Sequence, residues 1–292
     1  MRSSFGKRST AEVVTEGIDL RGKIALVTGV NSGIGMETMR VLALRGAHVI
    51  GTCRTFEKAE TACASVSGLT TPMACELADL DSVRDCAARI KGDFSQLDIV
   101  IANAGIMALP KLEQAHGIEL QFATNHLGHF LLVTSLVESL AEDARVVIVS
   151  SEAHRSTPKG GIEFDNLSGE TGYSALRAYG QSKLANILFA NRLAKQLEGR
   201  ATVNSLHPGV IGTNLGRHIH PMLAWTLGLV MFPFAKTIPQ GAATSCYVAT
   251  APELDNVSGR YFSDCEEKAA TTFATSEQLA DRLWTASENL VS

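Results

Sequence analysis

A tyrosine and a lysine four positions apart, Tyr179 and Lys183, are the first candidates for chemistry in this sequence. The residues that follow them, 184–189, are typical of a helix, and residues four apart share one helix face. A phenol with a pKa near 10 is a poor base at neutral pH, but a neighbouring ammonium favours the phenolate. The pair therefore predicts an acid–base group, although this spacing also fits an ordinary pair on a helix surface.

Two further polar residues are candidates for the same site. Ser151 follows the apolar run 146–150, and its hydroxyl could stabilise charge on a substrate oxygen. The same serine also fits a helix cap or a turn. Asn125 lies in a stretch that reads as a helix, where asparagine has modest propensity. It could hold a water that joins Lys183 to solvent, or it could be a surface residue.

A glycine-rich segment follows the first apolar run, 24–28, and precedes a helical pattern. Glycines at a strand-to-helix turn allow a tight turn, and the N–H groups of the helix start attract phosphate. The spacing differs from the commoner G-x-G-x-x-G, and an ordinary turn is the alternative. We therefore predict a dinucleotide site formed by Gly29, Asn31, Ser32, Gly33, Ile34 and Gly35.

The second apolar run, 48–52, ends in Cys53 and Arg54 rather than in a carboxylate. An acidic residue at this place would bind the adenosine ribose hydroxyls of NAD(H). A guanidinium instead pairs with a 2′-phosphate, so the sequence favours NADP(H), with NAD(H) as a second possibility. A solvated loop arginine is the alternative interpretation.

Apolar runs alternate with segments of helical periodicity along the chain, which predicts a doubly wound parallel sheet of the Rossmann type with helices on both faces. The strands expected are 24–28, 48–52, 99–102, 146–150 and 202–206. Helices are expected to begin near Gly33, Thr55, Leu80, Gly117, Ala175 and Gln240, with a last one over 276–290.

The composition bounds the class of protein. The chain has 292 residues, 45% of them hydrophobic, which favours one catalytic domain over 21–292 after a polar arm over 1–20. A net charge of −4 argues against nucleic acid as a partner. No apolar run is long enough for a membrane span. The six cysteines show no disulfide or zinc spacing, which favours a cytoplasmic location.

Several motifs in order resemble the short-chain dehydrogenase/reductase superfamily. These are TGVNSGIG at 28–35, NAG at 103–105, YGQSK at 179–183 and PGVIGT at 208–213, together with Asn125 and Ser151. TNHLGHF at 124–130, SSEAH at 150–154 and HPGVIGTNLGRH at 207–218 resemble the group of retinol dehydrogenases and WW-domain oxidoreductases. The resemblance covers most of the chain.

The resemblance implies roles that the residues alone do not give. Tyr179 would exchange the hydroxyl proton, Lys183 would orient the ribose and lower the tyrosine pKa, Ser151 would fix the carbonyl, and Asn125 would support a proton relay. The cofactor would contact Asn103, Ala104, Gly105, Pro208, Gly209, Ile211 and Thr213, besides Tyr179 and Lys183. Glu76 and Leu77 stand where relatives often have Asp-Leu beside the adenine, and the 27 residues between Ser151 and Tyr179 exceed those of a minimal member.

The segment 208–239 is expected to cover the substrate. Its apolar run 221–232 suggests a hydrophobic alcohol, aldehyde or ketone, although a buried helix or a subunit contact fits equally well. The apolar helices around 117–140 and 175–197 make a homo-oligomer possible, unless these faces simply cover the sheet. No metal is expected, because His126, His129, His218 and His220 lack accompanying acidic or thiolate ligands.

The sequence therefore predicts an NADP(H)-dependent alcohol dehydrogenase or carbonyl reductase. A catalytically silent regulator that binds NADP(H) is the alternative from another class, although the complete catalytic set argues against it. An epimerase or dehydratase on a related fold is disfavoured, because only about 80 residues follow Pro208.

Overall fold

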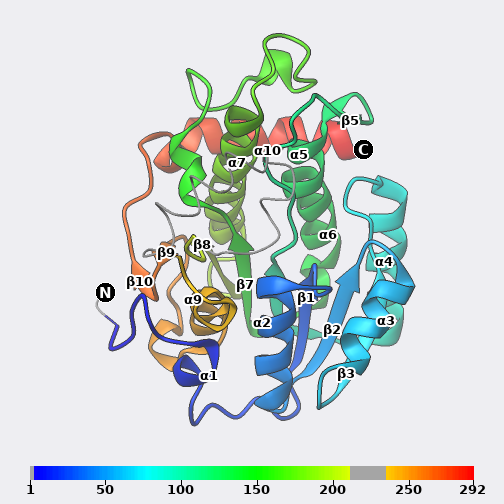
Figure 1. Ribbon diagram of the computed structural model, residues 1–292, viewed down its shortest axis with the longest axis vertical. Helices are drawn as coiled ribbons and strands as arrows, with labels where there is room; N and C mark the ends of the chain where they lie inside the picture. Colours follow the sequence, from blue (N-terminus) through cyan, green and yellow to red (C-terminus); the bar gives the residue numbers. More distant parts are fainter. Residues whose placement is uncertain (1–2, 211–234) are drawn as a thin grey trace.

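The computed structural model describes residues 3–210 and 235–292. Its main sheet has the strand order β10-β9-β8-β7-β4-β1-β2-β3 (Figure 1). Neighbouring strands run parallel except β10, which is antiparallel to β9. The strands are β1 (Ile24–Thr28), β2 (His48–Cys53), β3 (Thr70–Ala74), β4 (Leu97–Ala102), β7 (Leu140–Val149), β8 (Ala201–His207), β9 (Tyr261–Ser263) and β10 (Glu266–Glu267).

Helices cover both faces of this sheet, which confirms the predicted doubly wound fold. One face carries α2 (Gly33–Leu44), α3 (Phe56–Ala64) and α9 (Ile238–Thr250), and the other carries α4 (Leu80–Asp93), α6 (Gly128–Leu136) and α7 (Ala175–Gln196). The C-terminal helix α10 (Glu277–Val291) packs along α7. Short helical turns are η2 (Val137–Ser139), η3 (Glu152–Arg155), η4 (Phe164–Asn166), η7 (Pro252–Leu254) and η8 (Phe273–Thr275).

The helix expected to begin near Gly117 starts differently. His116 and Gly117 have φ of 51° and 74° and form the turn between two short strands, β5 (Gln114–Ala115) and β6 (Ile118–Glu119). Two consecutive residues with positive φ are what a tight hairpin turn requires. The helix follows as α5 (Leu120–Phe122), then a π-helical turn η1 (Ala123–Leu127), and then α6.

The N-terminal segment packs against the sheet-covering helices. It contains the one-turn helix α1 (Ala11–Val14), whose two terminal residues are buried in the core beneath α9 and α2. Glu12 also forms an ion pair with Arg40 of α2. The arm predicted over 1–20 is therefore held against the catalytic fold where the structure describes it.

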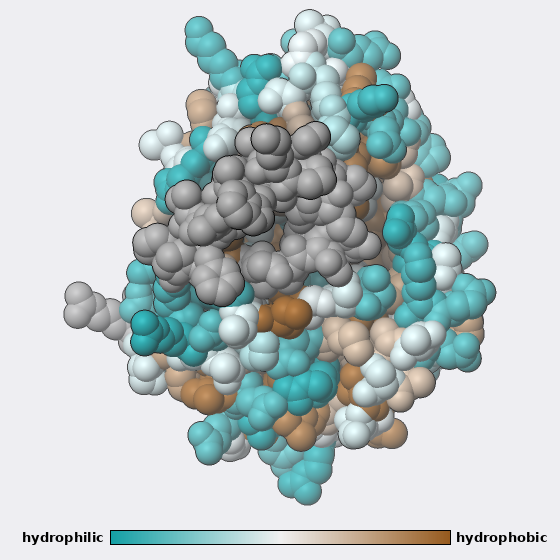
Figure 2. Space-filling model, in the orientation of Figure 1, coloured by the Kyte–Doolittle hydropathy of each residue, from teal (hydrophilic) through white to brown (hydrophobic). Residues whose placement is uncertain are grey.

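Strands β1 and β4 lie side by side at the centre of the sheet, and the chain continues from them to opposite sides. The carboxyl ends of strands at such a switch point are where open α/β sheets bind ligands. Figure 2 shows hydrophilic side chains over much of the visible face, with apolar ones scattered among them. None of the helices described is both long and apolar enough to cross a membrane.

Candidate active site

The turn between β1 and α2 packs too closely for side chains at two of its glycines. Gly29 has φ of 74°, and a Cβ there would lie 2.9 Å from the Cα and Cβ of Ala104. A Cβ on Gly35 would lie 2.3 Å from the Gly29 carbonyl oxygen and 2.5 Å from Nδ2 of Asn103. These contacts explain the glycine spacing, because the first turn of α2 must lie directly on the strand end.

The N-terminus of α2 has the properties of a phosphate site. Its N-cap residue, Ser32, makes no side-chain hydrogen bond to the helix, so no side chain caps the first N–H groups of this 12-residue helix. Asn31 and Ser32 are exposed, while Gly33 and Ile34 are partly buried. The free N–H groups and the glycine cradle fit the pyrophosphate of a dinucleotide.

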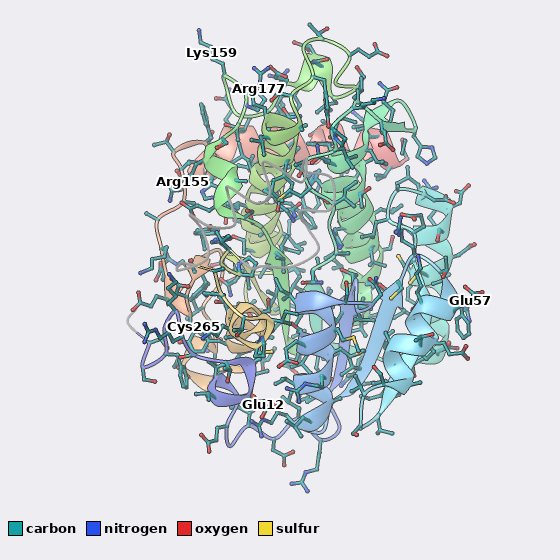
Figure 3. All side chains as sticks on the ribbon, in the orientation of Figure 1. Glu12, Glu57, Arg155, Lys159, Arg177 and Cys265 are labelled. Carbon is teal, nitrogen blue, oxygen red and sulfur yellow. The ribbon has the colours of Figure 1, made fainter. Side chains whose placement is uncertain are left out.

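The end of β2 has a neutral thiol and a free arginine where a carboxylate would favour NAD(H). The Cys53 thiol is buried, which raises its pKa to about 11, opposed by hydrogen bonds from the backbone of Val30 and Asn31. Arg54 is exposed and forms no hydrogen bond or ion pair with the described residues. The nearest acidic residue along the chain, Glu57, lies in the first turn of α3 and is exposed to solvent (Figure 3).

Thr28 joins the ends of β1 and β4. Its hydroxyl oxygen accepts hydrogen bonds from the backbone N–H groups of Asn103, at 2.9 Å, and Ala104, at 3.0 Å. The side-chain amide of Asn103 donates to the Thr28 carbonyl oxygen at 2.8 Å. The segment 103–105 is thereby fixed against the glycine turn, which brings two of the predicted cofactor segments together.

The two residues predicted beside the adenine are engaged within the protein. An oxygen of the Glu76 carboxylate accepts a hydrogen bond from the Ala78 backbone N–H at 3.2 Å. Leu77 is buried, and a Cβ on Gly128 would lie 2.2 Å from the Leu77 carbonyl oxygen. Both residues lie just after β3, and their contact with a cofactor stays a prediction.

Tyr179 and Lys183 lie on one face of α7 near Ser151. The phenol is buried, which raises its pKa to about 12, and a hydrogen bond with the Ser151 side chain opposes that rise. The Lys183 ammonium donates to the Val149 carbonyl oxygen at 3.1 Å and lies 5.8 Å from the centre of the tyrosine ring. Burial lowers the pKa of Lys183 to about 8. The Ser151 hydroxyl also accepts the Ala153 N–H of η3, so this serine is a helix cap, and its contact with a substrate oxygen stays a prediction.

Asn125 is fully buried within the π-helical turn and is not a surface residue. Its side chain accepts the Ile106 N–H at 2.8 Å, and donates to the Ile106 carbonyl at 2.9 Å and to the Ser182 hydroxyl at 3.0 Å. A Cβ on Gly105 would lie 3.1 Å from Oδ1 of Asn125 and 3.4 Å from Nζ of Lys183. All four predicted catalytic residues therefore converge beside segment 103–105.

Several residues that hold the catalytic residues in place were not predicted from the sequence. A Cβ on Gly180 would lie 2.3 Å from the Ser156 carbonyl oxygen, so α7 contacts η3 closely beside Ser151. Asn186 donates to the same Val149 carbonyl as Lys183, at 3.1 Å. A glycine inside a helical pattern is itself a signal of close approach, and Gly180 carried it. The other contacts join residues far apart in the sequence and left no local signal.

The last predicted cofactor segment is described only in part. Pro208 is buried, and Gly209 has φ of 101°. A Cβ on Gly209 would lie 2.5 Å from Cδ of Lys236, whose ammonium pairs with Asp264 at 2.5 Å. Ile211 and Thr213 lie outside the described residues, as does most of the predicted lid segment 208–239.

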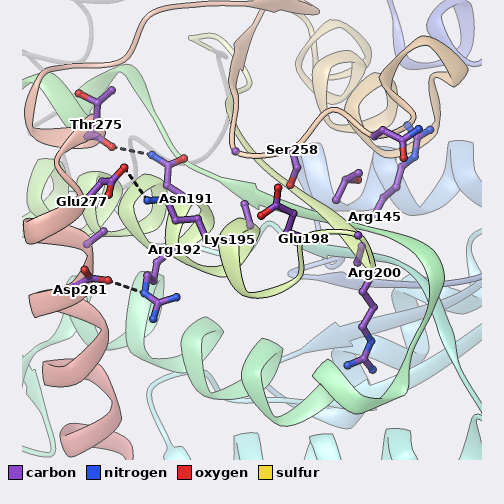
Figure 4. Close-up of a pocket in the computed structure, with 18 of the residues that line it drawn as sticks. Arg145, Asn191, Arg192, Lys195, Glu198, Arg200, Ser258, Thr275, Glu277 and Asp281 are labelled. Atoms are coloured by element: carbon purple, nitrogen blue, oxygen red, sulfur yellow. Dashed lines mark hydrogen bonds and ion pairs between the residues drawn. The ribbon is translucent and has the colours of Figure 1, made fainter.

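A cleft of about 830 Å³ lies elsewhere, beside the first residues of β8 (Figure 4). None of the predicted site residues that the structure describes lines it. Its four basic side chains are each paired with an acidic residue: Arg145 with Asp255, Arg192 with Asp281, Lys195 with Glu277 and Arg200 with Glu138. No free cation of the described residues is therefore offered to an anionic ligand there, and we place the candidate active site where the predicted residues converge.

The sheet order, the glycine turn and the Ser–Tyr–Lys–Asn cluster together define the class of α/β oxidoreductases that bind a nicotinamide dinucleotide. The chain matches the short chain dehydrogenase family over residues 23–224. It is 42% identical to the short-chain dehydrogenase TIC 32 A, chloroplastic, of Brassica napus, over 99% of this chain and 95% of that protein. The chain belongs to the short-chain dehydrogenase family, and it is a hydride-transferring oxidoreductase of the group that contains retinol dehydrogenases.

Further relatives agree with this assignment. Human retinol dehydrogenase 14 is 43% identical, over 93% of this chain and 87% of that protein. A solved structure of an uncharacterised Mycobacterium paratuberculosis protein has a TM-score of 0.78 at 32% identity, covering 95% of this chain and 96% of that one. A Burkholderia cenocepacia short chain dehydrogenase solved in complex with NADP has a TM-score of 0.66 at 25% identity, covering 83% and 96%.

The predicted cytoplasmic location is wrong. Two relatives that match 99% of this chain, TIC 32 A and TIC 32 B of Brassica napus, are named as chloroplastic. The prediction depended mainly on the cysteines, and all six are buried and unpaired. Buried thiols of this kind suit any reducing compartment, so they do not distinguish the cytoplasm from an organelle.

Proposed function

We propose that this protein transfers a hydride between NADP(H) and a hydrophobic alcohol, aldehyde or ketone. The observation that carries the proposal is the convergence of Ser151, Tyr179 and Lys183 beside a glycine cradle. The phenol contacts a hydroxyl that could bind the same substrate oxygen, and the buried ammonium lies 5.8 Å from the ring. Neighbouring proton and hydrogen-bond donors of this kind are what a carbonyl oxygen needs as negative charge develops on it.

In the reduction, Ser151 donates a hydrogen bond to the carbonyl oxygen and Tyr179 gives it a proton. Bound NADPH would supply the hydride to the carbonyl carbon and leave as NADP⁺. The raised pKa of Tyr179, about 12, keeps the phenol protonated at neutral pH, ready to act as the acid. In the oxidation the same oxygen must act as a base, and the Lys183 ammonium favours that phenolate.

Lys183 and Asn125 support this proton transfer to and from Tyr179. The ammonium is buried with the Val149 carbonyl as a hydrogen-bond acceptor, and its lowered pKa, about 8, makes it a ready proton donor. Asn125 holds Ile106 and Ser182 in place around it. We assign Lys183 to the nicotinamide ribose, and we assign Asn125 to the relay that returns a proton to Tyr179.

The preference for NADP(H) rests on Arg54. An exposed guanidinium with no partner among the described residues is free to pair with a 2′-phosphate. The thiol of Cys53 offers no acceptor comparable to a carboxylate for ribose hydroxyls. A structural relative was solved with NADP, which supports the same choice. A hydrophobic substrate is supported by the apolar run 221–232 and by the retinol dehydrogenases among the relatives.

The test follows NADPH and NADH absorbance separately while purified protein reduces a panel of hydrophobic aldehydes and ketones. We expect turnover with NADPH and a loss of at least about 10²-fold in kcat for Tyr179→Phe, since general acid catalysis contributes about 10²–10⁴-fold. The phenylalanine variant keeps the ring and should still bind NADPH. Tight NADPH binding with no turnover in either direction would instead favour the silent regulator. Faster turnover with NADH would contradict the assignment of Arg54.

A further inference from the structure

His129 lies one helical turn after Asn125 and is completely buried between two parts of the site. Its Nε2 atom lies 2.8 Å from the Thr28 hydroxyl oxygen, and its Nδ1 atom lies 3.0 Å from the Asn125 carbonyl oxygen. One ring therefore joins the end of β1 to the π-helical turn. Thr28 and His129 are 101 positions apart in the sequence. None of the proposed steps above uses this histidine.

The hydrogen bonds of Thr28 decide which ring nitrogen carries the proton. A hydroxyl has one proton and two lone pairs. The backbone N–H groups of Asn103 and Ala104 both donate to the Thr28 oxygen. The Thr28 proton is then directed to Nε2 of His129, which must be the unprotonated nitrogen. The proton of the neutral ring is on Nδ1, and it is donated to the Asn125 carbonyl.

A second proton on this ring is disfavoured by the same geometry. It would place an N–H of His129 against a hydroxyl oxygen whose lone pairs are both occupied. It would also place a positive charge on a ring whose pKa is lowered by burial and, to a smaller extent, by the Lys183 ammonium. The ring therefore stays neutral and holds both neighbours in a single arrangement.

We propose that His129 is a positioning residue that couples the cofactor turn to the proton relay. Through Nε2 it orients Thr28, which fixes Asn103 and Ala104, two of the residues predicted to contact the cofactor. Through Nδ1 it fixes the backbone of Asn125, the residue assigned to the relay beside Lys183. The kinetic half of this inference rests on the proposed function, whereas the half that concerns cofactor binding does not require turnover.

The chain offers a matched control in a second buried histidine. His126 lies three positions before His129 and is equally buried, but its Nε2 bonds the Ser287 hydroxyl of α10 at 2.9 Å. Ser287→Ala removes that hydrogen bond without touching Thr28 or the Asn125 carbonyl. A general loosening of this buried region should affect this variant and the His129 variants alike.

Three substitutions separate the two ends of the His129 ring. His129→Leu removes both hydrogen bonds, His129→Gln keeps an amide oxygen that reaches toward Thr28, and His129→Asn keeps an N–H near the Asn125 carbonyl. We expect the leucine variant to weaken NADPH binding about tenfold and to lower kcat about tenfold, since one hydrogen bond is worth about a factor of ten. His129→Gln should restore the Kd to within about threefold of the parent value but leave kcat low. His129→Asn should restore kcat to within about threefold but leave the binding of NADPH weak. Ser287→Ala should leave both within about twofold.

The Kd is measured by fluorescence titration with NADPH. The position of the proton on the His129 ring is measured by ¹⁵N NMR of histidine-labelled protein, and the spectrum of His129→Gln identifies the His129 signal. We expect a neutral ring with the proton on Nδ1. A proton on Nε2, or glutamine and asparagine variants that change the Kd by the same factor, would overturn the coupling. If the parent protein turns over no substrate, the proposed function fails, and the Kd values and the NMR spectrum still decide the inference.

Discussion

The buried lysine of the site should cost the folded protein stability, and replacing it should make the chain more stable while removing its activity. Lys183 is 3% exposed, and among the described residues its ammonium has a carbonyl but no carboxylate as a hydrogen-bond partner. Lys183→Met keeps a chain of similar length. It leaves no orphaned acceptor, because the Val149 carbonyl still accepts the Asn186 amide.

The magnitude follows from the pKa of the lysine. Burial lowers it from 10.5 to about 8, and each pKa unit corresponds to about 1.4 kcal/mol. Below pH 8 the lysine is charged in both the folded and the unfolded chain, and its burial costs roughly 3 kcal/mol. Between pH 8 and 10.5 the folded chain has released a proton that the unfolded chain still binds, so stability rises with pH. The advantage of the methionine variant should therefore shrink from about 3 kcal/mol at pH 7 to about 2 kcal/mol at pH 9.

The assay is urea unfolding of the parent and Lys183→Met at several pH values from 6.5 to 9.5. The difference between the two free energies of unfolding removes the contribution of other groups, such as the buried cysteines, that titrate in both. Lys236 provides the control, because it is equally buried but paired with Asp264. Lys236→Met should destabilise the protein, since it leaves Asp264 without its partner. If Lys183→Met gives no stabilisation at pH 7, or if the difference between the two free energies of unfolding stays constant with pH, the reasoning is refuted.

Four shorter predictions test other parts of the structure. Arg54→Asp should weaken NADPH binding about ten- to hundredfold and spare NADH, since a charge-assisted hydrogen bond is worth about 1.5–3 kcal/mol; fluorescence titration checks this. Gly35→Ala should destabilise the fold by about 1–3 kcal/mol in urea, because its Cβ would meet the preceding turn at 2.3 Å, and should abolish NADPH binding at micromolar concentrations. Gly180→Ala should lower kcat more than it raises KM, since the new Cβ would push η3, and with it Ser151, away from α7. An unchanged kcat would contradict the close packing of α7 on η3. His126 and His129 have pKa values lowered by burial to about 3 and 4, so the unfolded chain binds protons first, and urea unfolding should show stability falling as the pH drops from 6.5 toward 4.

The buried strands and most helix starts could be predicted because their signals are local. Residues 24–27 of strand β1 and residues 146–149 of strand β7 are continuous apolar runs, which a sheet covered on both faces requires. Strand β3 was missed because it is an edge strand, only partly buried, and carries Pro72, which weakens any strand pattern. The last strands, β9 and β10, are only three and two residues long and leave no periodicity to detect.

The site was predictable as a set of residue types, but not as a set of contacts. The motifs named Tyr179, Lys183, Ser151 and Asn125, and the structure brings all four together. The contacts that hold them come from elements far apart in the chain, such as His129 on Thr28. Asparagine 125 in a helical stretch was an unexplained feature, and the π-helical turn that buries it is set by tertiary packing. A pattern of residue types along one segment cannot encode such partners.

The hydroxyl of Thr28 ties together β1, the segment after β4, and α6, and this has a consequence for folding. A dinucleotide held by these elements cannot bind until the centre of the sheet has assembled, so it should have little affinity for a partly folded chain. Saturating NADPH would then raise the melting temperature of the whole protein in one transition, with a gain of about 2.7 kcal/mol at a hundredfold excess over the Kd. The supply of cofactor would in this way determine the lifetime of the protein against proteolysis as well as its rate of turnover.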